Sequence, residues 1–131
     1  MSRAVFAVRV LLGLVLLIVG LNGFLHVIPQ PPPPAEGGEF LVALADGGVL
    51  PLAKAFEVLV GGLLLSGRFV PLALVMLVPI AVGIVLYHLV FDVGGGVPAY
   101  AVAAMLAFLL WAYRGALRPL LVQKATPLVR G

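Results

Sequence analysis

The chain has 131 residues, of which 63% are hydrophobic and 10% are charged, and its formal net charge is +3. Soluble proteins contain about 45–50% apolar and about 25% charged residues, and five acidic plus eight basic side chains are too few to cover a soluble domain. Composition therefore predicts an integral membrane protein, and the lack of cysteine excludes disulfides, iron–sulfur ligation and dithiol chemistry within this chain.

The first predicted membrane span covers about residues 4–28, because a helix needs about 20 mostly apolar residues to cross the hydrocarbon core. Its last turns carry Asn22 and His26, which lie four residues apart and therefore share a helix face. The segment 29–48 follows as a predicted exterior loop. Its run of prolines favours a stiff polyproline II spacer.

Three more spans are predicted, at about residues 49–66, 69–91 and 97–113. Each has a proline in its first turn, where the missing N–H breaks no helical hydrogen bond: Pro51, Pro71 and Pro98. Pro79 lies deep in the third span and is expected to kink it. Short connections favour antiparallel neighbours. The sequence thus predicts one all-α domain over residues 1–131, a polytopic antiparallel bundle of four transmembrane helices.

Loop charge predicts the orientation of this bundle, because basic residues collect on the cytoplasmic side of membrane proteins. The bases flank the first span, separate the second from the third, and follow the fourth: Arg3, Arg9, Arg68, Arg114, Arg118, Lys124 and Arg130. The other two loops hold only acids: Glu36, Glu39, Asp46 and Asp92. Both termini and the tail 114–131 are therefore expected in the cytoplasm. This distribution also explains the positive charge without a nucleic-acid partner, for which we find no motif.

Small residues recur at intervals of four on two of the predicted spans. They are Gly62 with Ser66 on the second span, and Ala99, Ala103 and Ala107 on the fourth. Such stripes let helix backbones approach closely. The contact could be between helices of this chain, with another membrane subunit, or with a second copy, and the sequence leaves these options open.

Polar side chains gather in the outer half of the predicted bundle, and we take five of them as candidate site residues: Asn22, His26, Lys54, Glu57 and His88. Ionisable groups inside a membrane normally face the bundle interior and pair with one another. One interpretation is an outward-facing pocket with Glu57 as proton acceptor, Lys54 setting its charge, and the histidines relaying protons or binding a ligand. The other is a structural Lys54–Glu57 ion pair with histidines at helix interfaces. Whether Lys54 and Glu57 touch each other is left open.

The two histidines raise the question of a metal or haem. Two imidazoles at one depth could ligate haem axially, and with Glu57 they could bind a divalent metal. Neither spacing is diagnostic, and no HExxH motif is present. The sequence therefore disfavours haem and assigns neither a metal site nor a catalytic residue.

Three stretches resemble the DoxX-like family of small bacterial four-helix membrane proteins: LNGFLHVIPQPPPP, AKAFEVLVGGLLLSGRFVPLALVMLVPI and IVLYHLVFD. The matching positions include Gly20, Asn22, Gly23, Phe24, His26, Lys54, Glu57, Gly61, Gly67, Arg68, Pro71, Pro79 and His88. Relatives commonly have Asn-Ile where this chain has Gly83-Ile84. The resemblance implies the bacterial inner membrane and, because the family is named for subunits associated with thiosulfate:quinone oxidoreductase, a redox partner.

Together these observations predict a membrane subunit with an outer-leaflet polar pocket that binds quinone or lipid and associates with a redox complex. The chain would bind rather than catalyse on its own, in contact with membrane lipids and with other membrane subunits or copies of itself. One alternative is a structural accessory subunit of a respiratory or photosynthetic complex. Another is proton-linked transport by an oligomer, because four spans are few for a transport path.

Overall fold

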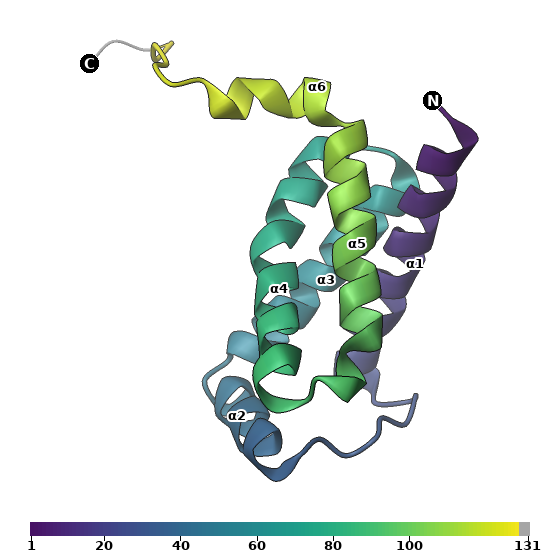
Figure 1. Cartoon of the computed structure of the whole chain (residues 1–131), viewed down its shortest axis with the longest axis vertical. Helices are drawn as coiled ribbons and strands as arrows, with labels where there is room; N and C mark the ends of the chain where they lie inside the picture. The colour runs from purple at the N-terminus through teal and green to yellow at the C-terminus, as the bar shows by residue number, and fades with distance from the viewer. Residues whose placement is uncertain (129–131) are drawn as a thin grey trace.

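The computed structural model describes residues 1–128, and within that range it is helical without β-strands. The helices are α1 (Arg3–Leu25), α2 (Ala35–Asp46), α3 (Val49–Ser66), α4 (Val70–Phe91), α5 (Val97–Ala112) and α6 (Arg114–Leu117), with 3₁₀ turns η1 (Gly94–Gly96) and η2 (Arg118–Leu121). Figure 1 shows four long helices side by side, with α2 at one end and the N-terminus and α6 at the other. Arg130, one of the bases counted above, lies outside the described residues.

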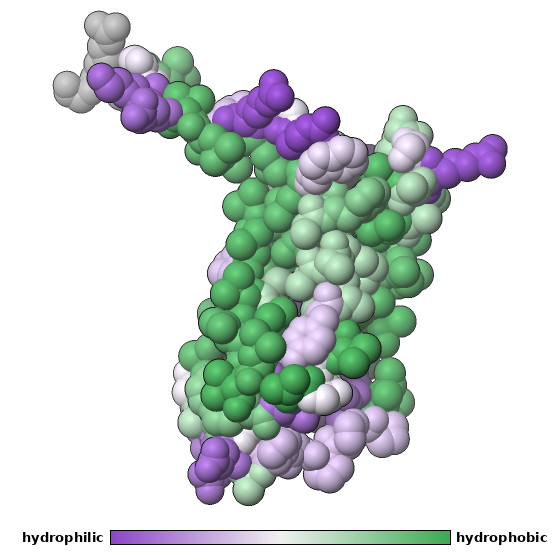
Figure 2. Space-filling model, viewed as in Figure 1, coloured by the Kyte–Doolittle hydropathy of each residue, from purple (hydrophilic) through white to green (hydrophobic). Residues whose placement is uncertain are grey.

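Four segments of the described chain are long and apolar enough to cross a membrane: Arg3–Leu25, Val49–Ser66, Val70–Phe91 and Gly94–Ala112. Figure 2 shows the hydrophobic side chains along the length of the bundle and the hydrophilic ones gathered toward its two ends. Large apolar side chains such as Phe24, Leu59 and Leu86 point outward, each about half exposed. This surface suits lipid rather than water. The predictions of an all-helical chain and of four helices able to span a membrane are confirmed.

Left-handed residues set several helix boundaries. α1 ends at Leu25, three residues before the predicted boundary, because His26 adopts φ 52° and ψ 39° while its N–H still donates to the Asn22 carbonyl. α3 lies between two glycines with positive φ, Gly48 at 81° and Gly67 at 74°. Glycine takes this conformation without a steric penalty, which makes it the usual residue at such helix ends.

The exterior segment 29–48 differs from the predicted spacer because its second part is helical. Pro34 is the N-cap of α2, with φ −54° and ψ 152°, and the chain then coils as far as Asp46. α2 packs on the end of α4 through Phe40, whose ring centroid lies 6.1 Å from that of Tyr87 and 5.4 Å from that of Phe91. The prolines therefore end where the helix begins, and aromatic packing stabilises α2.

The closest helix contact joins α1 and α3 and depends on glycine. A Cβ on Gly61 would lie 2.7 Å from the Leu17 nitrogen and 2.8 Å from the Gly13 oxygen, so the two backbones touch. The predicted stripe of Gly62 and Ser66 makes no close helix contact within the described chain, so of the options left open above only a contact with another subunit or a second copy remains for it. A Cβ on Gly62 would meet nothing within 4 Å. Ser66 is exposed, and its hydroxyl donates to the Leu63 carbonyl.

The contact between α4 and α5 is more open. Of the predicted alanine stripe, Ala99 is buried, Ala103 is half-buried and Ala107 is exposed. Ala103 and Ala107 line an apolar hollow of about 330 Å³ between the two helices. The stripe therefore supports close packing only near the start of α5. The core itself runs through α1, α3, α4 and α5, with its fully buried side chains at Leu12, Val60, Leu64, Ala73, Leu74, Leu77 and Leu109.

Candidate functional site

Lys54 and Glu57 form an ion pair on α3. Lys54 Nζ lies 3.2 Å from Glu57 Oε2, and the two residues are three positions apart on one helix face. Their exposures differ sharply, because the Lys54 side chain keeps 22% of its surface and the Glu57 side chain only 2%. The pair therefore has a buried carboxylate and an ammonium group that extends toward the surface, as lysines in apolar surroundings commonly do.

Two glycines of α1 make room for this pair. A Cβ on Gly23 would lie 2.6 Å from Lys54 Cγ and 2.7 Å from Lys54 Cδ, so the lysine stem crosses α1 at this position. A Cβ on Gly20 would lie 3.0 Å from the Lys54 carbonyl oxygen and 2.9 Å from Val58 Cγ2. Because Gly20 and Gly23 have no side chains, α1 can pack directly against the α3 backbone at Lys54 and against the Lys54 side-chain carbons.

The Glu57 carboxylate is incompletely satisfied. Its Oε2 atom is buried and, although within ion-pair distance of Lys54, has no hydrogen bond of proper geometry within the described chain. A buried charged group without full hydrogen bonding is costly, and such groups are frequent at binding sites. Oε2 is therefore an acceptor position that a ligand hydroxyl or a water molecule could fill.

Asn22 has a structural role at the end of α1. Its side-chain amide donates to the Ile28 carbonyl over 3.1 Å, and its side-chain oxygen accepts from the Ile28 N–H over 2.8 Å. These two bonds hold the turn that redirects the chain toward the prolines. Both polar atoms of the side chain are thus engaged with the backbone rather than with the Lys54–Glu57 pair.

The two histidines lie at separate places. His26 is exposed at the left-handed cap of α1. His88 is half-buried on α4, where its Nδ1 lies 3.4 Å from the Asp92 carbonyl oxygen and accordingly donates when Nδ1 carries the proton. Its ring meets that of Tyr87 edge-on, with centroids 5.1 Å apart. The hydroxyl of Tyr87 is buried without a hydrogen bond to any part of the described chain.

The structure therefore brings together only part of the predicted cluster. Lys54 and Glu57 are paired, and the ion pairs and hydrogen bonds among residues 1–128 connect neither histidine to them. Within the same range, no three side chains of histidine, aspartate or glutamate gather as metal ligands would. The alternative of two histidines and Glu57 around one divalent metal has no support in this arrangement.

Arg9 is a buried charge that the sequence analysis treated only as a marker of orientation. It is 8% exposed, and its Nη1 would lie 3.1 Å from a Cβ on Gly67, the cap of α3. Its guanidinium carbon lies 5.3 Å from the centroid of the Phe6 ring. A cation here is favoured because the C-terminal end of a helix carries partial negative charge. The burial of Arg9 could have been predicted from its position, because it is a charged residue within the apolar stretch of α1.

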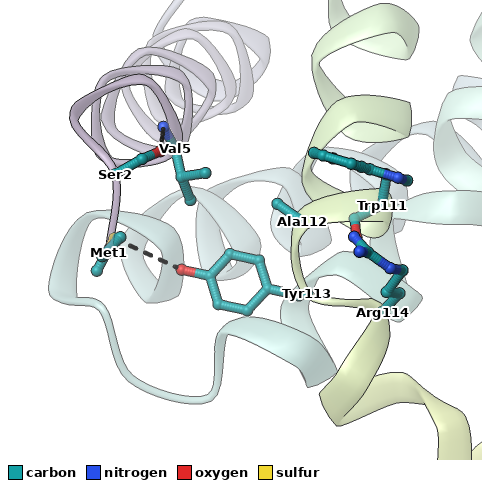
Figure 3. A pocket seen from close by; sticks show the side chains of 7 residues that line it. All are labelled: Met1, Ser2, Val5, Trp111, Ala112, Tyr113 and Arg114. Atoms are coloured by element: carbon teal, nitrogen blue, oxygen red, sulfur yellow. Dashed lines mark hydrogen bonds between the residues drawn. The ribbon is translucent and has the colours of Figure 1, made fainter.

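A second hollow lies at the end of the bundle where α1 begins. It has a volume of about 440 Å³ and is lined by Met1, Ser2, Val5, Trp111, Ala112, Tyr113 and Arg114. Figure 3 shows Tyr113 pointing toward Met1, while Arg114 stacks beside Trp111. We call this hollow the terminal cleft. Neither it nor the α4–α5 hollow includes one of the five predicted site residues.

Comparison of the chain with protein-family models, with curated proteins and with solved structures found no match. Within residues 1–128, fold and site together define the class as a helical protein with four helices able to span a membrane and an ion pair whose carboxyl group is buried.

Proposed function

We propose that this chain is a DoxX-like membrane subunit whose Lys54–Glu57 pair binds the polar head of a quinone or lipid beside a redox partner. The observation that carries the proposal is the Oε2 atom of Glu57, which is buried, lies 3.2 Å from Lys54 Nζ, and is free of hydrogen bonds from the described chain. A quinol hydroxyl is a donor of suitable chemistry, and the ammonium of Lys54 can donate to a quinone carbonyl. The role is binding, with no catalytic residue assigned.

The apolar surroundings of the pair support this choice of ligand. α1 and α3 present aliphatic side chains along their length, and α3 also exposes large apolar residues such as Phe56 and Leu59. Small-molecule sites in proteins are mostly apolar with a few converging polar groups. A molecule with one polar ring and a long hydrocarbon tail fits that pattern better than a soluble metabolite does.

Quinone affinity tests the proposal directly. Glu57→Gln keeps the size of the side chain and removes its charge, so we expect the Kd for a short-tailed ubiquinone in nanodiscs to rise about tenfold, the worth of one charge-assisted hydrogen bond. Glu39→Gln is the matched control, because Glu39 is an exposed acid on α2. Equal affinities for the wild type and a folded Glu57→Gln variant would rule out this site.

The proposal includes a bacterial inner membrane and an antiparallel bundle with both termini in the cytoplasm. Figure 1 supports it, because the N-terminus and α6 share one end of the bundle while α2 lies at the other. The chain has no cysteine, so single cysteines report orientation cleanly. In intact bacterial cells, an impermeant maleimide is expected to label Ala43→Cys and to label Thr126→Cys only after permeabilisation. The reverse pattern would invert the topology.

A structural accessory subunit is the second candidate, and a specific observation favours it. Asn22 and His88 both bond to nearby backbone atoms, and Ala103 and Ala107 line an apolar hollow that could receive a helix of another subunit. Copurification with other chains in mild detergent, lost on Ala107→Trp and kept on Glu57→Gln, is the result expected for this function. A wild-type chain that purifies alone and binds quinone would contradict it.

A further inference from the structure

The terminal cleft combines aromatic walls with a cation. The Arg114 guanidinium carbon lies 4.6 Å from the centroid of the Trp111 ring, and Arg114 Nη1 donates to the Trp111 carbonyl over 2.8 Å. These contacts fix the guanidinium at the rim of the cleft. Ser2 Oγ lies at the opposite wall, where it accepts from the Val5 N–H over 3.1 Å and caps α1. The hydroxyl of Tyr113 completes the polar lining.

The end of the bundle that holds this cleft carries positive charge. The bases Arg3, Arg68, Arg114, Arg118 and Lys124 belong to the chain ends and to the α3–α4 connection, whereas every acid except Glu57 lies on α2 or just after α4. Beyond α5 the chain turns sideways through α6 and η2, as Figure 1 shows, and these two turns begin at Arg114 and Arg118.

The aromatic residues of the cleft are of the kind found at the level of lipid headgroups. Trp111 is 60% exposed at the last turn of α5, and Tyr113 is its C-cap. Tryptophan and tyrosine gather at the level of the headgroups in membrane proteins. Apolar side chains, including Val5 and Ala112, form the rest of the lining, and they suit the glycerol and upper acyl carbons of a lipid.

We propose that the terminal cleft binds the headgroup of an anionic phospholipid, with Arg114 contacting the phosphate and with Trp111 and Tyr113 enclosing the glycerol. Charge complementarity selects an anionic lipid over a zwitterionic one, because no acid of the described chain lines the cleft. This site is at the opposite end of the bundle from α2, and it does not depend on the Lys54–Glu57 pair.

Lipid titration monitored by native mass spectrometry tests the proposal on the full chain in mild detergent. We expect dioleoylphosphatidylglycerol to bind more tightly than dioleoylphosphatidylcholine. Arg114→Gln should weaken the binding of phosphatidylglycerol about fivefold, the effect of one basic residue at an anionic surface. Arg118→Gln removes the same charge from η2 outside the cleft and should change the affinity less than twofold.

A second variant tests the cleft without changing charge. Ala112→Leu fills the cleft from its half-buried wall and should also weaken phosphatidylglycerol binding several-fold, with helix content unchanged by circular dichroism. If Arg114→Gln does not fold, Ala112→Leu still tests whether the terminal cleft binds the lipid. Equal losses in Arg114→Gln and Arg118→Gln, no loss in Ala112→Leu, equal binding of both lipids, or displacement by excess inorganic phosphate would each overturn the proposal.

Discussion

The α1–α3 interface and the α4–α5 interface differ in how closely their helices approach each other. Between α1 and α3, Gly13 and Gly61 let the two backbones meet, and a Cβ added at Gly61 would lie 2.7 Å from the Leu17 nitrogen. Between α4 and α5, Ala103 and Ala107 line a hollow of about 330 Å³. Membrane helices associate through van der Waals contact more than through the hydrophobic effect. The first interface is therefore the tighter of the two.

The two interfaces also differ in polarity. The buried carboxylate of Glu57 and the stem of Lys54 lie along the α1–α3 contact, whereas the α4–α5 hollow has an almost wholly apolar lining. A buried ion pair requires fixed geometry, because its desolvation is offset only when the charges stay together. The comparison indicates that the more closely packed interface holds the polar group and that the more open interface is apolar.

The largest expected effect comes from adding one methyl group to the tight interface. Gly61→Ala places a Cβ against backbone atoms of α1 that cannot move independently, and we expect it to lower the free energy of unfolding by about 3 kcal/mol. Titration with sodium dodecyl sulfate in mixed micelles measures this change. Gly62→Ala is the control, because its Cβ meets nothing within 4 Å. If both variants unfold at the same detergent fraction, α1 and α3 do not touch at Gly61.

A smaller effect is expected nearer the ion pair. Gly20→Ala would press on Val58 Cγ2 at 2.9 Å and on two backbone atoms, the Lys54 carbonyl oxygen and the Val58 nitrogen, at 3.0 Å, a less close approach than the 2.7 Å at Gly61. We expect a loss of about 2 kcal/mol by the same titration. The variant should also loosen the cover over Lys54, so chemical acylation of this lysine should become faster. Unchanged stability together with an unchanged rate of acylation would contradict the assigned contact.

The third prediction concerns the coupling of Lys54 and Glu57. A double-mutant cycle of Lys54→Met and Glu57→Gln is expected to give a coupling energy of about 1 kcal/mol, within the range of polar interactions measured inside membranes. Lys54→Met alone should cost more than the double variant, because it leaves the buried carboxylate without its cation. A coupling energy near zero would show that the 3.2 Å contact contributes nothing to stability.

The smallest effect is expected at the more open interface. Ala107→Leu extends into the α4–α5 hollow, where free space accommodates the larger side chain, and we expect a change of less than about 0.5 kcal/mol in the free energy of unfolding. Ala99→Leu is the contrast, because Ala99 is 7% exposed and should not tolerate the larger side chain. A strongly destabilised Ala107→Leu would mean that α4 and α5 pack as closely as α1 and α3.

The spans were predictable because their length and apolar content follow directly from the thickness of the bilayer. α2 was not predictable in the same way. Its sequence AEGGEFLVALAD follows a run of prolines, contains two adjacent glycines and has no side-chain cap, so its local signals favour a loop. The aromatic contact of Phe40 with Tyr87 and Phe91 stabilises it, and that contact joins residues about fifty positions apart.

The candidate site was predictable only in part. The spacing of Lys54 and Glu57 predicts a shared face, but their contact with each other depends on side-chain conformation. The role of Asn22 depends on the left-handed φ of His26, which turns the chain back so that Ile28 reaches the Asn22 side chain. Adjacent residues on a helix point about 100° apart. To predict that Gly61 and not Gly62 contacts α1, one must know how α3 is oriented about its own axis.

The pairing of α1 with α3 has a consequence for biogenesis. All the residues of the tight contact, from Gly13 to Gly61, and both members of the ion pair are present once Ser66 has left the ribosome. The first half of the bundle can therefore associate before α4 and α5 are made, as sequential assembly during synthesis allows. The later helices then add to a template in which Lys54 already lies beside the buried carboxyl group of Glu57.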